Sequence, residues 1–136
     1  MTVRTATEND LETISAYDAH ISREELGYSI SRNRVFLAEE GGKFLGWMRY
    51  NLFWDNTPFL NMLFLLEGQR ERGFGRQMMD FWESEMRVLG YRLVMTSTAS
   101  NECAQHFYTK LGYRAVGSFL PEGEPLELIF SKRLSP

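Results

Sequence analysis

The stretch from Leu63 to Gln77 constrains the fold more than any other part of the sequence. It opens with the apolar run Leu63-Phe64-Leu65-Leu66 and continues into a turn that contains glycine and arginine. An amphipathic helix is predicted to follow, because apolar residues recur at the spacing of one buried helix face: Phe74, Met78, Phe81, Trp82, Met86 and Leu89. Gly90 stands where a left-handed C-cap would end that helix. The pattern therefore predicts a strand, a loop and a helix, with the loop at the helix N-terminus.

The loop has the composition of an anion-binding site. Backbone N–H groups in the first turn of a helix lack internal partners, and the helix dipole gives that end a partial positive charge. Gly73 and Gly75 have no Cβ, so a bulky anion can approach the backbone closely. Three arginines and one acid accompany them: Arg70, Arg72, Arg76 and Glu71. Because the whole chain has a net charge of −3, this concentration of arginine favours a phosphate or pyrophosphate ligand over an ordinary solvated turn.

Two familiar phosphate-binding motifs do not account for this loop. The sequence has no Gly-x-x-x-x-Gly-Lys-Ser/Thr, so the loop is not a P-loop. It also lacks the third glycine of a dinucleotide fingerprint and lies in the middle of the chain instead of after a first strand. A nucleotide-binding protein of another fold therefore stays only as a distant alternative.

Two sequence blocks resemble a known family. Residues 70–75, Arg-Glu-Arg-Gly-Phe-Gly, fit Gln/Arg-x-x-Gly-x-Gly/Ala, the acetyl-CoA pyrophosphate motif of the GNAT superfamily of N-acetyltransferases. Residues 101–113, Asn-Glu-Cys-Ala-Gln-His-Phe-Tyr-Thr-Lys-Leu-Gly-Tyr, resemble the second block of that family, Asn-x-x-Ala-x-x-Phe-Tyr-x-x-x-Gly-Phe. Both blocks occur in the family's order and at its usual separation. One departure is Glu71, where the family often has a second glycine.

The residue patterns and the resemblance together predict one α/β (α+β) domain that spans residues 1–136. Seven stretches are predicted as strands: 2–6, 34–40, 43–54, 59–66, 91–98, 113–120 and 126–134. Thr7 with Asp10, and Ser22 with Glu25, have the spacing of capping boxes at the start of two helices that precede residue 34. We expect about four helices on a mixed, mostly antiparallel sheet of six to seven strands. By resemblance, its central strands splay apart to hold acetyl-CoA.

The resemblance also implies the residues that contact this co-substrate. They are Phe64, Leu65, Leu66, Arg70, Glu71, Arg72, Gly73, Phe74, Gly75, Arg76, Asn101 and Tyr108. The backbone N–H groups of Phe64, Leu65 and Leu66 would bind the pantetheine arm and polarise the thioester carbonyl. By the same resemblance, Tyr108 occupies the family's general-acid position. A phenol with a reference pKa near 10 stays protonated at neutral pH, so it can donate a proton. Without the resemblance, Tyr108 would read as a half-buried helix aromatic and Asn101 as a helix cap.

The acceptor is the least determined part of the site. Delivering a lysine-like amine in neutral form at pH 7 costs about 4.6 kcal/mol, which calls for a proton acceptor. Many members of the family place a glutamate on the central strand, but here the corresponding residues 61–63 are Asn-Met-Leu. Glu67, Asp55 or ordered water are the alternatives, and Trp54, Asn61 and Glu67 are the candidate substrate contacts. Because this carboxylate is missing, a second function stays open: a catalytically silent GNAT-fold protein that binds acyl-CoA as a sensor or interaction module.

Composition limits the remaining choices. Hydrophobic residues make up 43% and charged residues 24% of the 136 residues, which is typical of a soluble globular protein of one domain. The acidic balance argues against nucleic-acid binding, and no apolar run suits a signal peptide or a membrane span. The single cysteine, Cys103, fits a reducing compartment, so we expect the cytoplasm. Cys103 and His106 are too few ligands for a metal site. A homodimer is expected only by analogy with the family.

Overall fold

The computed structural model describes residues 1–136 and contains seven strands and four α-helices. In chain order the elements are β1 (Thr2–Thr5), the 3-10 helix η1 (Glu8–Asp10), α1 (Leu11–Tyr17), α2 (Arg23–Ser31), β2 (Val35–Glu40), β3 (Lys43–Phe53), β4 (Thr57–Leu65), α3 (Phe74–Val88), β5 (Leu93–Ala99), α4 (Ala104–Lys110), β6 (Arg114–Phe119) and β7 (Glu127–Arg133). The strands form one sheet in the order β1-β2-β3-β4-β5-β7-β6. The predicted fold class is therefore confirmed. No helix combines the length and the apolar character that crossing a membrane requires.

The sheet is mixed because one of its pairings is parallel. The pairs β1–β2, β2–β3, β5–β7 and β6–β7 run antiparallel. By contrast, β4 pairs with β5 in parallel, through Phe59 with Met95 and Leu60 with Thr96. This parallel register is short, although β4 continues to Leu65 and β5 to Ala99.

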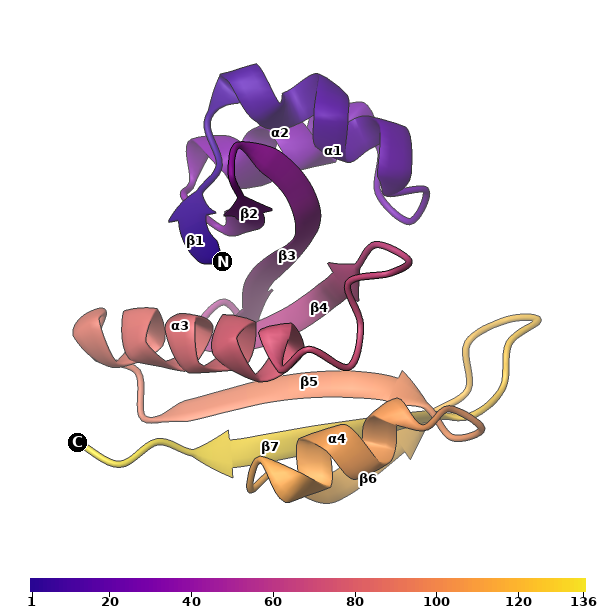
Figure 1. The fold of residues 1–136 in the computed structure, drawn as a ribbon. Helices are drawn as coiled ribbons and strands as arrows, with labels where there is room; N and C mark the ends of the chain where they lie inside the picture. Colours follow the sequence, from indigo (N-terminus) through magenta and orange to yellow (C-terminus); the bar gives the residue numbers. More distant parts are fainter. The chain divides into compact units, whose positions relative to one another are not determined.

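Two compact units divide the chain. The first comprises Met1–Asn51 and Met62–Phe81, and the second comprises Leu52–Asn61 and Trp82–Pro136. In the first unit, the helices α1 and α2 lie together beside β1 to β3 (Figure 1). Their buried residues pack against β2 and β3 in one apolar cluster: Ala6, Ile14, Leu26, Ile30, Val35, Leu37 and Trp47.

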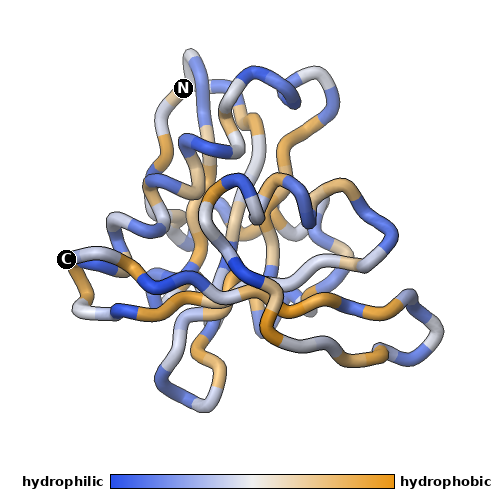
Figure 2. The backbone as a smooth tube through the Cα atoms, turned by 90° about the horizontal axis from the view of Figure 1, so that it is seen from below, coloured by the Kyte–Doolittle hydropathy of each residue, from blue (hydrophilic) through white to orange (hydrophobic).

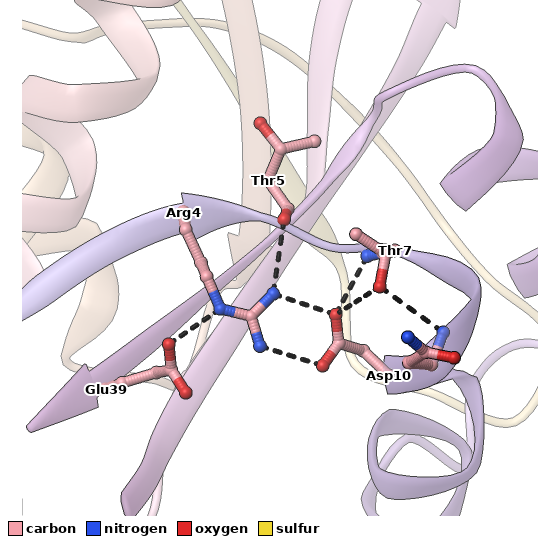
Figure 3. A network of polar contacts seen from close by, with 6 residues as sticks. Arg4, Thr5, Thr7, Asp10 and Glu39 are labelled. Carbon is pink, nitrogen blue, oxygen red and sulfur yellow. Dashed lines mark hydrogen bonds and ion pairs between the residues drawn. The ribbon is translucent and has the colours of Figure 1, made fainter. Parts of the chain in front are cut away.

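Polar contacts fix the start of the first helical segment. The Thr7 hydroxyl accepts a hydrogen bond from the Asn9 N–H, and the Asp10 carboxylate accepts one from the Thr7 N–H at 2.8 Å. The capping box predicted from Thr7 and Asp10 is thus confirmed. Arg4 adds a guanidinium that bridges Asp10 on η1 and Glu39 on β2 (Figure 3). The Arg4 hydrogen bond is the main reason that the pKa of Asp10 lies below its ordinary value.

In the second unit, β5, β7 and β6 form an antiparallel sheet (Figure 1), and α4 packs against β7 through the rings of Tyr108 and Phe130. A buried carboxylate links α3 to this sheet, since Glu83 accepts hydrogen bonds from the Tyr113 hydroxyl and the Lys132 ammonium, both at 2.8 Å. Burial, together with the charge of Glu83, raises the pKa of Tyr113. Figure 2 shows hydrophobic and hydrophilic residues interspersed along the backbone, with hydrophilic residues at many of its outer loops.

Candidate functional site

The backbone groups at the end of β4 point in alternate directions. The Leu66 N–H donates to the Leu45 carbonyl of β3 at 2.8 Å. Because hydrogen-bonding groups alternate in direction along a strand, the N–H and C=O of Leu65 point away from β3. The Leu65 carbonyl accordingly accepts a hydrogen bond from Arg70 Nε at 3.2 Å. Of the three backbone N–H groups expected to hold a pantetheine arm, the Leu65 N–H is thus the one directed away from β3.

Gly46 determines how closely β3 approaches this strand end. A Cβ at Gly46 would lie 2.3 Å from the Phe64 carbonyl oxygen and 3.1 Å from the Leu65 Cα. The first of these contacts is shorter than a Cβ tolerates, so a side chain at this position would require the backbone of one strand to shift. The sequence analysis missed Gly46. A glycine in the middle of a strand with bulky neighbours, such as Leu45 and Trp47, was the available signal.

The loop that follows, residues 67–73 and here called the arginine loop, turns through three left-handed residues. Gly68, Glu71 and Gly73 have φ values of +87°, +63° and +78°. Nothing lies within 4 Å of a Cβ built on Gly73, so the space beside its backbone is open. The Gln77 N–H donates to the Gly73 carbonyl at 3.2 Å, which marks the first turn of α3. No acidic residue stands in that turn, so no carboxylate of the turn itself interacts with the positive end of the helix dipole.

The loop's arginines lie against aromatic rings of the same segment. The Arg70 guanidinium carbon lies 5.0 Å from the centroid of the Phe64 ring, and that of Arg72 lies 4.4 Å from the Phe74 ring. Arg72 also donates to the Gln69 side-chain carbonyl at 2.8 Å. Arg76, in the first turn of α3, is exposed. The structure thus brings together the predicted loop residues as a cationic segment at a helix N-terminus.

The first unit also contains a buried ion pair that the sequence analysis did not find. Asp18, which follows α1, is 3% exposed and accepts hydrogen bonds from Arg49 Nε at 2.8 Å and Trp47 Nε1 at 3.0 Å. Burial alone would raise the pKa of Asp18, but the hydrogen bonds from Arg49 and Trp47 outweigh it and lower the pKa. The Trp47 ring in turn packs 5.2 Å from the Phe64 ring. Asp18 therefore fixes the end of α1 against the strand next to β4.

The predicted general acid, Tyr108, lies on α4 in the second unit and is buried. Its ring packs against the rings of Phe107, Tyr113 and Phe130, at centroid distances of 5.3, 5.7 and 6.1 Å. Burial raises the pKa of the phenol above its ordinary value of 10.0, a hydrogen bond with Thr96 opposes that rise, and nearby carboxylates add to it. Tyr108 is consequently a protonated phenol throughout the neutral range.

Asn101 lies exposed in the turn between β5 and α4. The N-cap of α4 is Cys103, so Asn101 does not cap this helix. Instead, the Gln105 side chain closes this turn by donating to the carbonyls of Ser100 and Glu102, at 2.9 and 3.1 Å. The hydrogen bonds that close this turn therefore come from Gln105 and not from Asn101.

The three candidate substrate contacts lie on separate segments. Trp54 is 80% exposed in the β3–β4 turn, has a φ of +55° and stacks on Phe53 at 5.7 Å. Asn61 occupies an exposed position of β4, and Glu67 is exposed directly after that strand. Trp54 and Asn61 belong to the second unit, whereas Glu67 belongs to the first.

Comparison with known proteins gives a consistent result. The family model described as the acetyltransferase (GNAT) family matches residues 4–113. An acetyltransferase of the GNAT family from Bacillus cereus is 24% identical, with a TM-score of 0.80 and coverage of 99% of this chain and 98% of that one. PaiA N-acetyltransferase from Thermoplasma acidophilum, solved with coenzyme A, is 17% identical over 98% of both chains, with a TM-score of 0.80.

A third similar structure is the ribosomal-protein-S18-alanine N-acetyltransferase from Escherichia coli. It is 16% identical, has a TM-score of 0.83 and covers 99% of this chain and 94% of that one. The comparison with curated proteins gave no match. At these identities the structures establish the fold, while the family match over most of the chain establishes membership: the chain belongs to the GNAT family of acetyltransferases.

Proposed function

We propose that this protein is an acetyl-CoA-dependent N-acetyltransferase that acetylates a primary amine of a small molecule or peptide. The observation that carries the proposal is the arginine loop, with its open backbone at Gly73 and its two ring-stacked guanidinium groups. Backbone N–H groups at a helix N-terminus and bidentate arginines are the donors that a pyrophosphate needs. The family match supports the same ligand.

The co-substrate would follow the loop and the strand end. Its pyrophosphate would bind residues Arg70 to Arg76, which include the end of the arginine loop and the first turn of α3. Gly73 and Gly75 would give close access to the backbone. The pantetheine arm would run along the outward edge of β4, where the Leu65 N–H is the donor directed away from β3. Phe64 and Leu66 would then contribute packing, because alternation turns their N–H groups toward β3. Asn101 remains a proposed contact from the second unit.

The chemistry would be direct acyl transfer without a covalent enzyme intermediate. The amine nitrogen attacks the thioester carbonyl carbon, a carbon–nitrogen bond forms, and the carbon–sulfur bond breaks. A proton leaves the nitrogen to water or a nearby carboxylate, and the departing thiolate takes the phenolic proton of Tyr108. The resulting phenolate then regains a proton from water. Burial raises the pKa of Tyr108 above its ordinary value of 10.0, so the phenol keeps its proton at neutral pH until the thiolate forms.

Three residues are proposed contacts of the acceptor. Asn61 on β4 and the exposed Trp54 would contact its side chain, and Glu67 is the carboxylate closest in sequence to the strand end. No feature of these three distinguishes a peptide N-terminus from a small amine. A panel of acceptors is therefore part of the test.

The test is release of free thiol from acetyl-CoA in the presence of polyamines, aminoglycosides, amino acids, or peptides with free N-termini or lysines. Amine-dependent release would support the transferase and identify its acceptor class. Tyr108→Phe should then lower turnover by about 100-fold while the Kd for acetyl-CoA stays unchanged. Binding without release by any acceptor would instead favour an acyl-CoA-binding module.

Placement of the pyrophosphate is tested separately by Gly75→Arg. The added side chain should block the approach to the loop and raise the Kd for acetyl-CoA at least tenfold. Gly117→Arg is the matched control, because nothing lies within 4 Å of a Cβ on Gly117 of β6. Normal acetyl-CoA binding by Gly75→Arg would mean that the ligand is wrongly placed.

A further inference from the structure

Arg72 of the arginine loop is held by three contacts. Its Nη1 donates to the Gln69 side-chain oxygen at 2.8 Å, and its Nη2 donates to a Glu40 carboxylate oxygen at 3.4 Å. The guanidinium carbon lies 4.4 Å from the centroid of the Phe74 ring. All four residues belong to the first unit. Although the Arg72 side chain is 47% exposed, its guanidinium therefore has a defined position.

The contact with Glu40 differs from the other two because it is long-range. Gln69 and Phe74 are close neighbours of Arg72 in the chain, whereas Glu40 is the last residue of β2 and lies 32 residues away. Within the sheet, Glu40 pairs with Lys43 of β3. The Arg72–Glu40 ion pair therefore joins the arginine loop to the β2–β3 hairpin.

The two polar partners of Arg72 differ in charge, so they act differently on an incoming anion. A guanidinium has more N–H donors than these partners use, so Arg72 can still donate to a phosphate oxygen. The Gln69 amide is neutral and orients the guanidinium without cancelling its charge. The Glu40 carboxylate is itself an anion, so it competes with a phosphate for the same Nη2 donor. Because both side chains are nearly half exposed, this ion pair is weak and a pyrophosphate can replace it.

We propose that Arg72 exchanges Glu40 for the pyrophosphate of the co-substrate, while Gln69 keeps the guanidinium in position. This inference rests on the proposed function, which assigns the pyrophosphate to the arginine loop. Gln69 is then a positioning residue, and Glu40 is a resident counter-ion that lowers the affinity for the co-substrate. The two residues consequently have opposite effects on the Kd, which a general loss of loop stability would not produce.

The experiment measures the Kd of acetyl-CoA by isothermal titration calorimetry, which requires no acceptor amine and no turnover. Gln69→Ala should raise the Kd about fivefold, because an unrestrained guanidinium loses more conformational entropy on binding. Glu40→Gln keeps an acceptor oxygen and removes the charge, so it should lower the Kd about threefold. Glu39→Gln is the matched control, because it removes the same charge from the neighbouring position of β2, where the partner is Arg4; its Kd should be that of the wild type.

Further comparisons show whether the two residues act through Arg72 and on the pyrophosphate. In an Arg72→Met background, neither Gln69→Ala nor Glu40→Gln should change the Kd further. Dephospho-coenzyme A keeps the pyrophosphate and lacks the 3′-phosphate, so the fold-changes measured with it should equal those measured with coenzyme A. In the thiol-release assay, both variants should change the KM for acetyl-CoA and leave kcat at the wild-type value, as expected of residues that act on binding alone.

An unchanged or raised Kd in Glu40→Gln, an unchanged Kd in Gln69→Ala, or equal effects in the Arg72→Met background would overturn the inference. Effects that disappear with dephospho-coenzyme A would overturn it as well, because Arg72 would then bind the 3′-phosphate. These outcomes leave amine-dependent thiol release, and with it the proposed transferase, intact. A wild-type protein that binds neither acetyl-CoA nor coenzyme A would overturn the proposed function and this inference together.

Discussion

Replacing Asp18 by alanine would remove the acceptor of the buried hydrogen bonds that join the end of α1 to β3. Arg49, 8% exposed, would keep its charge with no counter-charge, and the Trp47 N–H would lose its acceptor. The His20 N–H, which donates to Asp18 Oδ1 at 3.1 Å, would lose its partner as well. We therefore predict a large loss of stability from this single change.

The size of the loss follows from what the alanine leaves behind. Breaking a buried ion pair by removing one partner costs about 3–5 kcal/mol, because the remaining charge is desolvated without compensation. Taking about 4 kcal/mol, and about 3 °C per kcal/mol for a chain of this size, the Tm should fall by about 12 °C. Removing both charges, as in Asp18→Leu with Arg49→Met, should recover most of this loss, because apolar residues of similar volume replace buried ion pairs well.

Urea denaturation measures the free energy of unfolding of these variants. Glu12→Gln is the control, since it removes the carboxylate of the exposed Glu12–Arg23 pair and should leave stability unchanged. Because the folded-state pKa of Asp18 is lowered, its contribution is present above the ordinary pKa of 3.8 and is lost as the pH falls through the folded value. The gap between wild type and Asp18→Ala should thus narrow only below about pH 4. A loss under about 1 kcal/mol at neutral pH would refute the reasoning.

Three further predictions concern the site. Glu71→Gly should raise the free energy of unfolding by about 0.5–1 kcal/mol in urea denaturation, because glycine adopts the left-handed φ of +63° without strain; a loss of stability would contradict this. Gly46→Ala should lower it by about 1–3 kcal/mol, since its Cβ would meet the Phe64 carbonyl oxygen at 2.3 Å; an unchanged value would mean that β3 can move aside. The ratio of wild-type to Tyr108→Phe turnover should stay constant from about pH 7 to about pH 9, because burial raises the pKa of the phenol; a ratio that falls in this range would refute it.

Local patterns predicted the elements well, since their causes lie within a few residues. The helical spacing after the loop identified the buried face of α3, where Phe74, Met78, Trp82 and Met86 are all buried. The same pattern extended too far at its end, because α3 stops at Val88 and Leu89 is exposed. Ser22 accepts a hydrogen bond from the Glu25 N–H at 3.1 Å, as its capping-box spacing predicted. Periodicity and capping are thus readable without knowledge of the tertiary fold.

The missed features depend on partners that are distant in sequence. Asp18 and Arg49 are 31 residues apart, and Thr96 and Leu60 are 36 apart. Their pairing is set by strand register and by how the α1–α2 segment meets β3, neither of which a residue pattern specifies. Gly46 is similar, because its role depends on which backbone atoms of β4 lie opposite it. The sequence therefore identified the arginine loop as a candidate site, but it did not identify the long-range contacts of Asp18, Thr96 and Gly46.

In the function proposed above, the arginine loop is the part of this acidic chain that would bind the polyanionic co-substrate. Its guanidinium groups are planar, and two of them lie over rings that the same segment supplies, Phe64 on one side and Phe74 on the other. Such stacking restricts each side chain before a ligand arrives, so less conformational entropy is lost on binding. Glu71 has a left-handed φ of +63° at the position where glycine is more usual in the family. Its two neighbours are the arginines that we propose bind the anion. The departure from the family pattern thus adds backbone strain to the loop and removes none of the proposed binding groups.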